Sequence, residues 1–220
     1  MSAIVVFGAG GRAGRAILAE ATRRGHRVTA VVRDPAKYPD LAAGTTDGTG
    51  DISVVAGDIG SASSVAGVVA GHDAVVHAAA ALARPADLVF AEAALALLDG
   101  LPRAGVSRLV AIGMAANLEV SPGVRLMDEP DFPAEYLPFA LGHTAGLHVL
   151  RAAPAEVDWV MLTPPMVLDE GPCTGRYRTG GDEVLTPGEP GHLSYADLAI
   201  AVLDEIETPK HHRTRIAVGD

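Results

Sequence analysis

A glycine-rich loop near the start of the chain carries the clearest chemical signal in the sequence. It follows the apolar run 3–7, precedes an Ala-rich stretch, and reads Gly8, Ala9, Gly10, Gly11, Arg12, Ala13, Gly14. Glycines spaced in this way between a strand and a helix permit a tight turn, a close approach of a pyrophosphate, and close helix–strand packing. The free N–H groups at the start of the helix then face the phosphates. We therefore predict a dinucleotide-binding loop made of Gly8, Gly10, Gly11, Arg12, Ala13 and Gly14; a purely structural glycine turn is the alternative.

The residues after the second apolar run, 27–32, bear on which dinucleotide binds. An NAD-specific site offers an acidic residue there, about 20 residues after the glycine loop, to hold the ribose hydroxyls. This chain offers Arg33 first, and Arg12 lies within the loop. Two guanidinium groups that converge near the adenosine 2′ position would hold a 2′-phosphate through charge-assisted hydrogen bonds. We therefore predict NADP(H) rather than NAD(H) as the cofactor; the alternative is a solvated Arg33 paired with Asp34.

Short apolar runs typical of buried strands alternate with longer Ala/Leu-rich stretches typical of helices. The predicted strands are 3–7, 27–32, 52–56, 74–79, 108–112 and 159–163, and the predicted helices are 12–24, 61–70, 85–104 and 137–153. This alternation is typical of a parallel sheet with helices on both faces. The sequence therefore predicts a single α/β domain over residues 1–220, with a Rossmann-type doubly wound parallel sheet.

The last quarter of the chain has a different pattern. Residues 164–193 are rich in Pro and Gly around a short extended piece at 175–179 and are predicted to form a small C-terminal lobe on the substrate side. A helix at 195–206 with Ser194 as its N-cap follows, and then a last strand at 214–218. The segment 39–50 is predicted to be a flexible loop.

Nearly the whole chain resembles the atypical short-chain dehydrogenase/reductases, in particular the NAD(P)H-binding, NmrA-like group that includes biliverdin-IXβ and flavin reductases. The resemblance is carried by the glycine loop, by Gly57-Asp58-Ile59, and by the segment 194–199 (SYADLA). It implies that Asp58 and Ile59 flank the adenine. It also implies a cofactor trench along the carboxyl ends of the strands, lined by Ala78, Ala79, Ala80, Ile112, Gly113 and Met114, and closed over the nicotinamide by Pro164, Pro165 and Met166. Ligands of open α/β sheets do bind at that edge.

The chain departs from the wider superfamily at the catalytic positions. Relatives that reduce carbonyls use a Tyr-x-x-x-Lys pair, and the corresponding residues here are Phe139 and His143. Phenylalanine has no acidic proton, whereas an imidazole can hydrogen-bond the ribose or donate a proton near neutral pH. His143 is therefore the predicted catalytic residue and is also counted among the cofactor contacts; a partly buried helix histidine is the alternative. The serine or threonine that many relatives carry after the fifth strand is replaced by Gly113.

Three functions fit these residues, and we predict the first of them. The first is an NAD(P)H-dependent reductase of a small or cyclic organic substrate such as a flavin, a quinone or a tetrapyrrole, since such an acceptor can take its proton from solvent. The second is a regulatory module that senses NADP without catalysis, because both residues of the usual pair are lost. The third is an isomerase or epimerase on the same scaffold.

Composition excludes several other classes. The chain has 17 Lys and Arg against 27 Asp and Glu, for a net charge of −10, which argues against a nucleic-acid partner. The single cysteine, Cys173, excludes an internal disulfide, and no His/Asp/Glu set has the spacing of a metal site. We see neither a signal peptide nor an apolar segment long enough to cross a bilayer, and so expect a cytoplasmic protein without a membrane partner.

Overall fold

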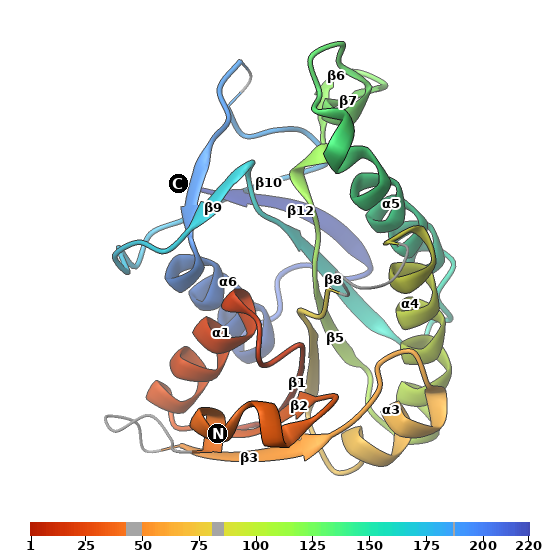
Figure 1. The fold of residues 1–220 in the computed structure, drawn as a ribbon, viewed down its shortest axis with the longest axis vertical. Helices are drawn as coiled ribbons and strands as arrows, with labels where there is room; N and C mark the ends of the chain where they lie inside the picture. The colour runs from red at the N-terminus through yellow and green to blue at the C-terminus, as the bar shows by residue number, and fades with distance from the viewer. Residues whose placement is uncertain (43–49, 81–85, 187) are drawn as a thin grey trace.

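An eight-stranded sheet forms the centre of the molecule (Figure 1), in a computed structural model that describes residues 1–42, 50–80, 86–186 and 188–220. Its strand order is β10-β12-β8-β5-β4-β1-β2-β3, and neighbouring strands are parallel except for β10 and β12. The strands are β1 (Ala3–Phe7), β2 (Arg27–Val32), β3 (Asp51–Ala56), β4 (Ala74–His77), β5 (Arg108–Ile112), β8 (Asp158–Thr163), β10 (Arg178–Gly180) and β12 (Thr214–Gly219). The predicted Rossmann-type α/β class is confirmed.

Helices cover both faces of this sheet. In Figure 1, α1 and α6 lie on one side, and α3, α4 and α5 on the other. The long helices are α1 (Arg12–Arg23), α3 (Ala62–Val69), α4 (Ala86–Arg103), α5 (Leu137–Arg151) and α6 (Tyr195–Glu207), and a short α2 spans Pro39–Ala42. The loop predicted at 39–50 therefore begins with a helical turn, and residues 43–49 of that prediction lie outside the described residues.

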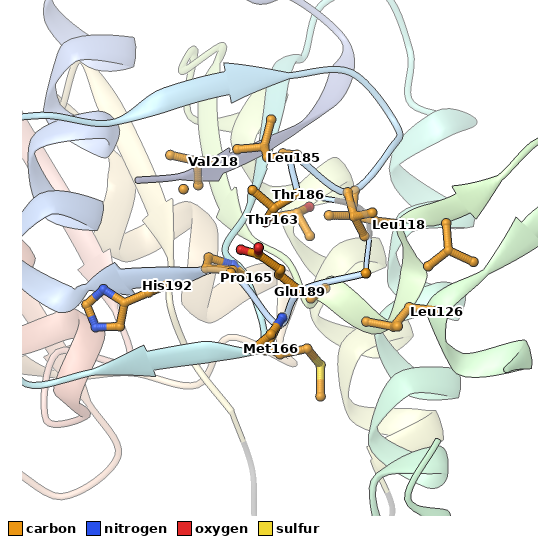
Figure 2. Close-up of a pocket in the computed structure, with 18 of the residues that line it drawn as sticks. Leu118, Leu126, Thr163, Pro165, Met166, Leu185, Thr186, Glu189, His192 and Val218 are labelled. Carbon is orange, nitrogen blue, oxygen red and sulfur yellow. The ribbon is translucent and has the colours of Figure 1, made fainter. Parts of the chain in front are cut away.

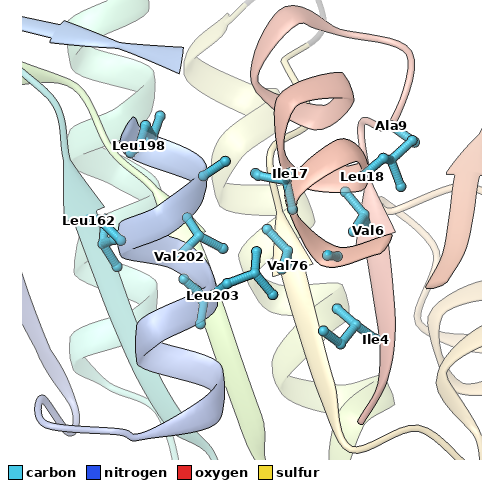
Figure 3. Close-up of a cluster of buried hydrophobic side chains, with 14 of the residues drawn as sticks. Ile4, Val6, Ala9, Ile17, Leu18, Val76, Leu162, Leu198, Val202 and Leu203 are labelled. Carbon is cyan, nitrogen blue, oxygen red and sulfur yellow. The ribbon is translucent and has the colours of Figure 1, made fainter. Parts of the chain in front are cut away.

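The core has one layer on each face, because successive side chains of a strand point to opposite faces. Ile4 and Val6 of β1 pack with α1 and α6, as Figure 3 shows, whereas Val5 and Phe7 pack with the helices of the opposite face. All five residues of β1 are buried, which explains its unbroken apolar run. Arg24, just after α1, donates to Glu20 and to Asp204 and Glu207 of α6, and so ties the two helices together.

The order of the strands creates a switch point between β1 and β4. The chain builds β1, β2 and β3 outward in one direction and then returns to place β4 on the other side of β1. At such a point the two flanking loops separate at the carboxyl ends of the strands, which leaves a crevice for a ligand. The glycine loop follows β1 at this edge, so the fold places the predicted binding loop at the switch point.

The segment 164–193 contains two short strands and the start of a third. β9 (Val167–Asp169) pairs with β11 (His192–Ser194) in a separate parallel sheet, and β10 joins the edge of the large sheet. The extended piece predicted at 175–179 lies instead at Arg178–Gly180, because the Asp197 carboxylate accepts the N–H groups of Thr174 (3.0 Å) and Gly175 (2.9 Å). The Ser194 N-cap is confirmed, since its hydroxyl accepts the N–H of Asp197 at 3.0 Å.

A separate loop, 115–133, crosses the carboxyl edge between β5 and α5. It contains the small hairpin of β6 (Glu119–Ser121) and β7 (Val124–Arg125). Within the described ranges, no helix combines the length and apolarity that crossing a membrane requires.

Candidate functional site

The glycine loop has the geometry that phosphate binding requires, and its three spaced glycines have different roles. A Cβ on Gly8, whose φ is +83°, would lie 2.5 Å from the backbone of Ala79, and one on Gly14 would lie 2.2 Å from the carbonyl oxygen of Gly8. Any side chain at these two positions would therefore clash with the backbone, so packing requires glycine at both. A Cβ on Gly11 would meet nothing closer than 3.4 Å, so Gly11 leaves open space just before the first N–H groups of α1. An approaching phosphate fits that space.

The other predicted cofactor residues lie along the same carboxyl edge of the sheet. Residues 58–59 follow β3, residues 78–80 follow β4, residues 112–114 end β5, and residues 164–166 follow β8. We call this row, together with the glycine loop, the trench. Asp58 accepts the N–H of Gly60 at 3.0 Å, and its own N–H donates to Ser64 at 2.9 Å, which fixes the turn after β3. Residues spread over more than 150 positions of the sequence thus meet at one edge.

A basic hollow borders the glycine loop at the end of β2. It is lined by Arg33, Asp34, Lys37 and Tyr38. The Tyr38 ring covers Gly10, where a Cβ would lie 2.3 Å from a ring carbon. Lys37 lies 3.6 Å from the Asp34 carboxylate. Sequence reasoning missed Lys37 and Tyr38; the signal that would have found Lys37 is its position four residues after Arg33, beyond a short 3-10 turn (Pro35–Lys37).

The Arg12 side chain lies outside the hollow that contains Arg33, and the convergence of the two on a 2′-phosphate stays a prediction. The Arg12 guanidinium lies over the ring of Tyr195, 5.1 Å from its centroid, at the start of α6. The reason is that Arg12 is the first residue of α1, which packs against α6, so a cation–π contact with α6 is within reach.

His143 is in the helix predicted for it, but its surroundings contradict a role as proton donor. Its ring stacks on Phe90 of α4, with 3.8 Å between centroids, and lies 5.0 Å from the ring of Phe139. Only 7% of the residue is exposed. Burial, together with the nearby charge of His77, lowers the pKa of His143 to about 3, so no imidazolium is available near neutral pH. The structure therefore supports the alternative, a packed helix histidine.

A second, larger cavity adjoins the trench. It has a volume of about 410 Å³ and is lined by residues from loop 115–133, from the end of β8, and from segment 184–192 (Figure 2). Pro165 and Met166, which we predicted to close over the nicotinamide, line this cavity as well. The N–H of Met166 donates to the carbonyl of Pro190 at 3.1 Å, and so joins two of its walls. We call this cavity the pocket.

The walls of the pocket are held by a buried arginine. Arg215 of β12 is 6% exposed and donates to the Asp182 carboxylate at 2.8 Å and to the carbonyl of Asn117 at 2.8 Å. It thereby fastens the segment before 184–192 to the loop 115–133. Among the described residues, no group of three or more His, Cys, Asp and Glu lies close enough together to hold a metal ion.

An open, mainly parallel sheet with a glycine loop at its switch point defines the class of Rossmann-type dinucleotide-binding proteins. A family model described as NAD(P)H-binding matches residues 8–209. The chain therefore belongs to the NAD(P)H-binding family of atypical short-chain dehydrogenase/reductases, as the resemblance implied. This is a family of NAD(P)-binding Rossmann-fold oxidoreductases.

Known proteins similar to this chain span its full length. The uncharacterized protein YwnB of Bacillus subtilis (strain 168) is 37% identical over 219 residues, which cover 98% of this chain and 97% of that protein. A structure from Bacteroides thetaiotaomicron named "putative epimerase" has a TM-score of 0.85 and 35% identity, covering 99% of this chain and 96% of that one. A structure from Streptococcus pneumoniae TIGR4 named "putative NADH-flavin reductase" has a TM-score of 0.83 and 29% identity, with full coverage of both chains.

Proposed function

We propose that the protein is an NAD(P)H-dependent reductase that passes a hydride to a conjugated organic acceptor such as a flavin, a quinone or a tetrapyrrole. The observation that carries this proposal is the pocket, because Pro165 and Met166, the residues predicted to cover the nicotinamide, line it. Its volume of about 410 Å³ is within the range of small-molecule sites. The relative named "putative NADH-flavin reductase" agrees with this class of acceptor.

The residues of the trench have separable tasks in this proposal. Gly11 and the start of α1 hold the pyrophosphate, while Arg33 and Lys37 hold the 2′-phosphate of NADPH. Pro165 and Met166 cover the nicotinamide and exclude water from it. Bound NADPH supplies the hydride. Positions 139 and 143 hold no acidic proton for the acceptor, so we infer an acceptor whose reduced form takes its proton from solvent.

An epimerase is the second candidate, since a relative with 35% identity carries that name. The two differ in their use of the cofactor: a reductase consumes NADPH with each turnover, whereas an epimerase regenerates it. A small-molecule substrate, the absence of a nucleic-acid partner and a cytoplasmic location remain predictions from the sequence.

The test is NADPH consumption, followed by its absorbance, with a panel of flavins, quinones, tetrapyrroles and small carbonyls. The matched control is Gly11→Val, since a side chain at Gly11 meets open space in the protein but fills the approach of the phosphate. We expect wild-type turnover with at least one conjugated acceptor. Gly11→Val should keep the wild-type melting temperature and lose cofactor binding by at least about tenfold, that is by about 1.4 kcal/mol or more. Cofactor binding without NADPH consumption for any acceptor would overturn the proposal.

A further inference from the structure

The rim of the pocket is acidic. Four of its lining residues carry carboxylates, namely Glu129, Asp131, Glu189 and Asp220, and two are basic, Arg178 and His192. Among the described residues, Glu129, Asp131 and Glu189 have no ion pair or side-chain hydrogen bond. All three are exposed at the mouth. In Figure 2 the Glu189 carboxylate projects among the lining side chains, rather than away from them.

The two basic residues offset this charge only in part, because four carboxylates outnumber them. The Nε atom of Arg178 donates to the backbone carbonyl of Asp220 at 2.6 Å. His192 lies 3.0 Å from the carboxylate of Asp169 and 3.6 Å from that of Asp220. The mouth of the pocket therefore has an excess of negative charge, and a ligand must pass it to reach the interior.

Among the described residues that line the pocket and are fully buried, Thr163 has the only polar side chain; Thr186, which also lines it, is partly exposed. Leu118, Ala217 and Val218 are buried there. Thr163, at the end of β8, is 1% exposed, and its Oγ1 has no hydrogen-bond partner in the described chain. An unpaired buried hydroxyl is costly, so a structure that retains one suggests that a ligand supplies the partner.

The hydroxyl of Thr163 lies at the boundary between pocket and trench. A Cβ built on Gly113 would lie 2.6 Å from Thr163 Oγ1. The hydroxyl of β8 thus fills the space that a side chain at the end of β5 would occupy. Thr163 also lines the pocket, so its hydroxyl lies at the wall that the pocket and the trench share.

We propose that the pocket binds an uncharged conjugated acceptor whose carbonyl oxygen accepts a hydrogen bond from Thr163, and that the acidic rim discriminates against anionic acceptors. This inference rests on the proposed reductase function. In the reaction, NADPH gives up a hydride with two electrons and becomes NADP⁺. The acceptor receives that hydride together with one proton from solvent, and leaves in its dihydro form.

Riboflavin and flavin mononucleotide are the matched substrates for the test, since they share the reacting ring and differ only in a phosphate. We expect kcat/KM for riboflavin to exceed that for flavin mononucleotide by at least about tenfold at low ionic strength, because the rim repels the phosphate. The ratio should fall toward unity as salt shortens the Debye length from about 30 Å at 0.01 M to about 3 Å at 1 M. Equal values at low salt, or a preference for flavin mononucleotide, would overturn the inference.

Neutralising the rim separates this effect from the total charge of the protein. The double variant Glu189→Gln/Asp131→Asn should raise kcat/KM for flavin mononucleotide relative to that for riboflavin. The control is Glu156→Gln, an exposed residue just before β8 at the opposite edge of the sheet, which should change neither. If the control raises the value for flavin mononucleotide as much as a single rim substitution does, the rim is not the selective element.

The hydroxyl is tested with Thr163→Val and Thr163→Ser. Valine keeps the shape and should raise KM for riboflavin by about tenfold, while serine keeps the hydroxyl and should restore most of the wild-type value. Equal KM in all three proteins would remove Thr163 from the site. Failure of the proposed function looks different, since then no acceptor of either charge is reduced although NADPH binds.

Discussion

Two buried histidines near the trench have pKa values well below the usual value of histidine. His77, at the end of β4, and His143, in α5, both lie near the ring of Phe90, at 6.4 Å and 3.8 Å between centroids. Burial lowers the pKa of His77 to about 4 and that of His143 to about 3. Both are therefore neutral in the folded protein at pH 7, whereas in the unfolded chain they titrate near 6.5.

This difference predicts how stability depends on pH. Because the folded pKa values are depressed, the unfolded chain binds more protons than the folded protein below about pH 6.5. Stability is therefore complete above about pH 6.5 and decreases as the pH falls toward the folded values. The slope approaches about 3 kcal/mol per pH unit for two protons. Urea unfolding at pH 7, 6 and 5 measures the free energy of unfolding and should show a loss on the order of 2 kcal/mol between pH 6 and 5.

Substitution of one histidine should remove its share of this dependence. His143→Leu keeps an apolar side chain in the same packing site and should reduce the slope by about half. His148→Gln is the control, since His148 is exposed on the same helix, and it should retain the wild-type slope. A slope that His143→Leu leaves unchanged would show that His143 binds a proton in the folded protein after all, and would reopen its catalytic role.

The position of His143 could be predicted from the sequence, but its environment could not. Counting along the helix 137–153 places His143 at the position that corresponds to the lysine of the family's Tyr-x-x-x-Lys pair. Its burial depends on Phe90 in α4, which lies more than 50 residues away, and only the packing of α4 on α5 brings the two rings together. The same limit applies to Thr163, because only the structure shows that its hydroxyl lies next to Gly113 at the end of the neighbouring strand.

At the scale of elements, we predict that the segment from β2 into the following 3-10 turn sets the preference for NADPH over NADH. Its side chains Arg33 and Lys37 line one hollow. Among the described residues, Lys37 has a single ion-pair partner, the Asp34 carboxylate at 3.6 Å, and Arg33 has no ion pair or side-chain hydrogen bond. Arg33→Ala and Lys37→Ala should each weaken NADPH binding by about 1.5–3 kcal/mol and leave NADH binding unchanged. Calorimetric titration of both cofactors measures this.

The control for this prediction is Arg27→Ala. Arg27 is exposed at the start of β2, at the opposite end of the same strand, so its loss changes the net charge equally without reaching the hollow. It should alter neither affinity. Equal affinities of the wild type for NADPH and NADH would contradict the assigned preference.

Elements were predictable where burial leaves a strong pattern. β1, β2 and β5 have the predicted bounds, because strands of a parallel sheet are buried on both faces and give unbroken apolar runs. β9 and β11 were missed, because three residues in a Pro/Gly-rich segment show no periodicity. The pocket depends on that segment and on loop 115–133, so its shape could not be predicted from the sequence. Pro165 and Met166 were predicted as cofactor contacts and not as part of a separate pocket.

For the molecule as a whole, the candidate binding site and a buried ion-pair network lie at opposite edges of the sheet. The trench and the pocket occupy the carboxyl edge, whereas the ion-pair network occupies the amino edge. Its centre is Arg108, the first residue of β5, which donates to the Glu205 carboxylate at 2.9 Å and to Asp158 at 3.0 Å. The side chains of Arg108 and Glu205 are 8% and 7% exposed. The network joins β5, β8 and α6.

Breaking this network should lower stability without changing the affinity of the folded protein for its cofactor. Arg108→Met leaves the Glu205 carboxylate buried without its arginine partner, although the backbone N–H groups of Lys210 and His211 still donate to it. This change should cost about 3–5 kcal/mol of unfolding free energy. Arg103→Met is the control, because the Arg103–Asp99 pair is exposed, and it should cost no more than about 1 kcal/mol. Urea unfolding gives the free energies, and titration under native conditions gives the NADPH affinity. The double variant Arg108→Met/Glu205→Leu should recover part of the loss, since an apolar pair leaves no charge unpaired. If the double variant lost as much stability as the two single variants together, the two side chains would act independently. If the NADPH affinity fell together with the stability, the two edges of the sheet would be coupled.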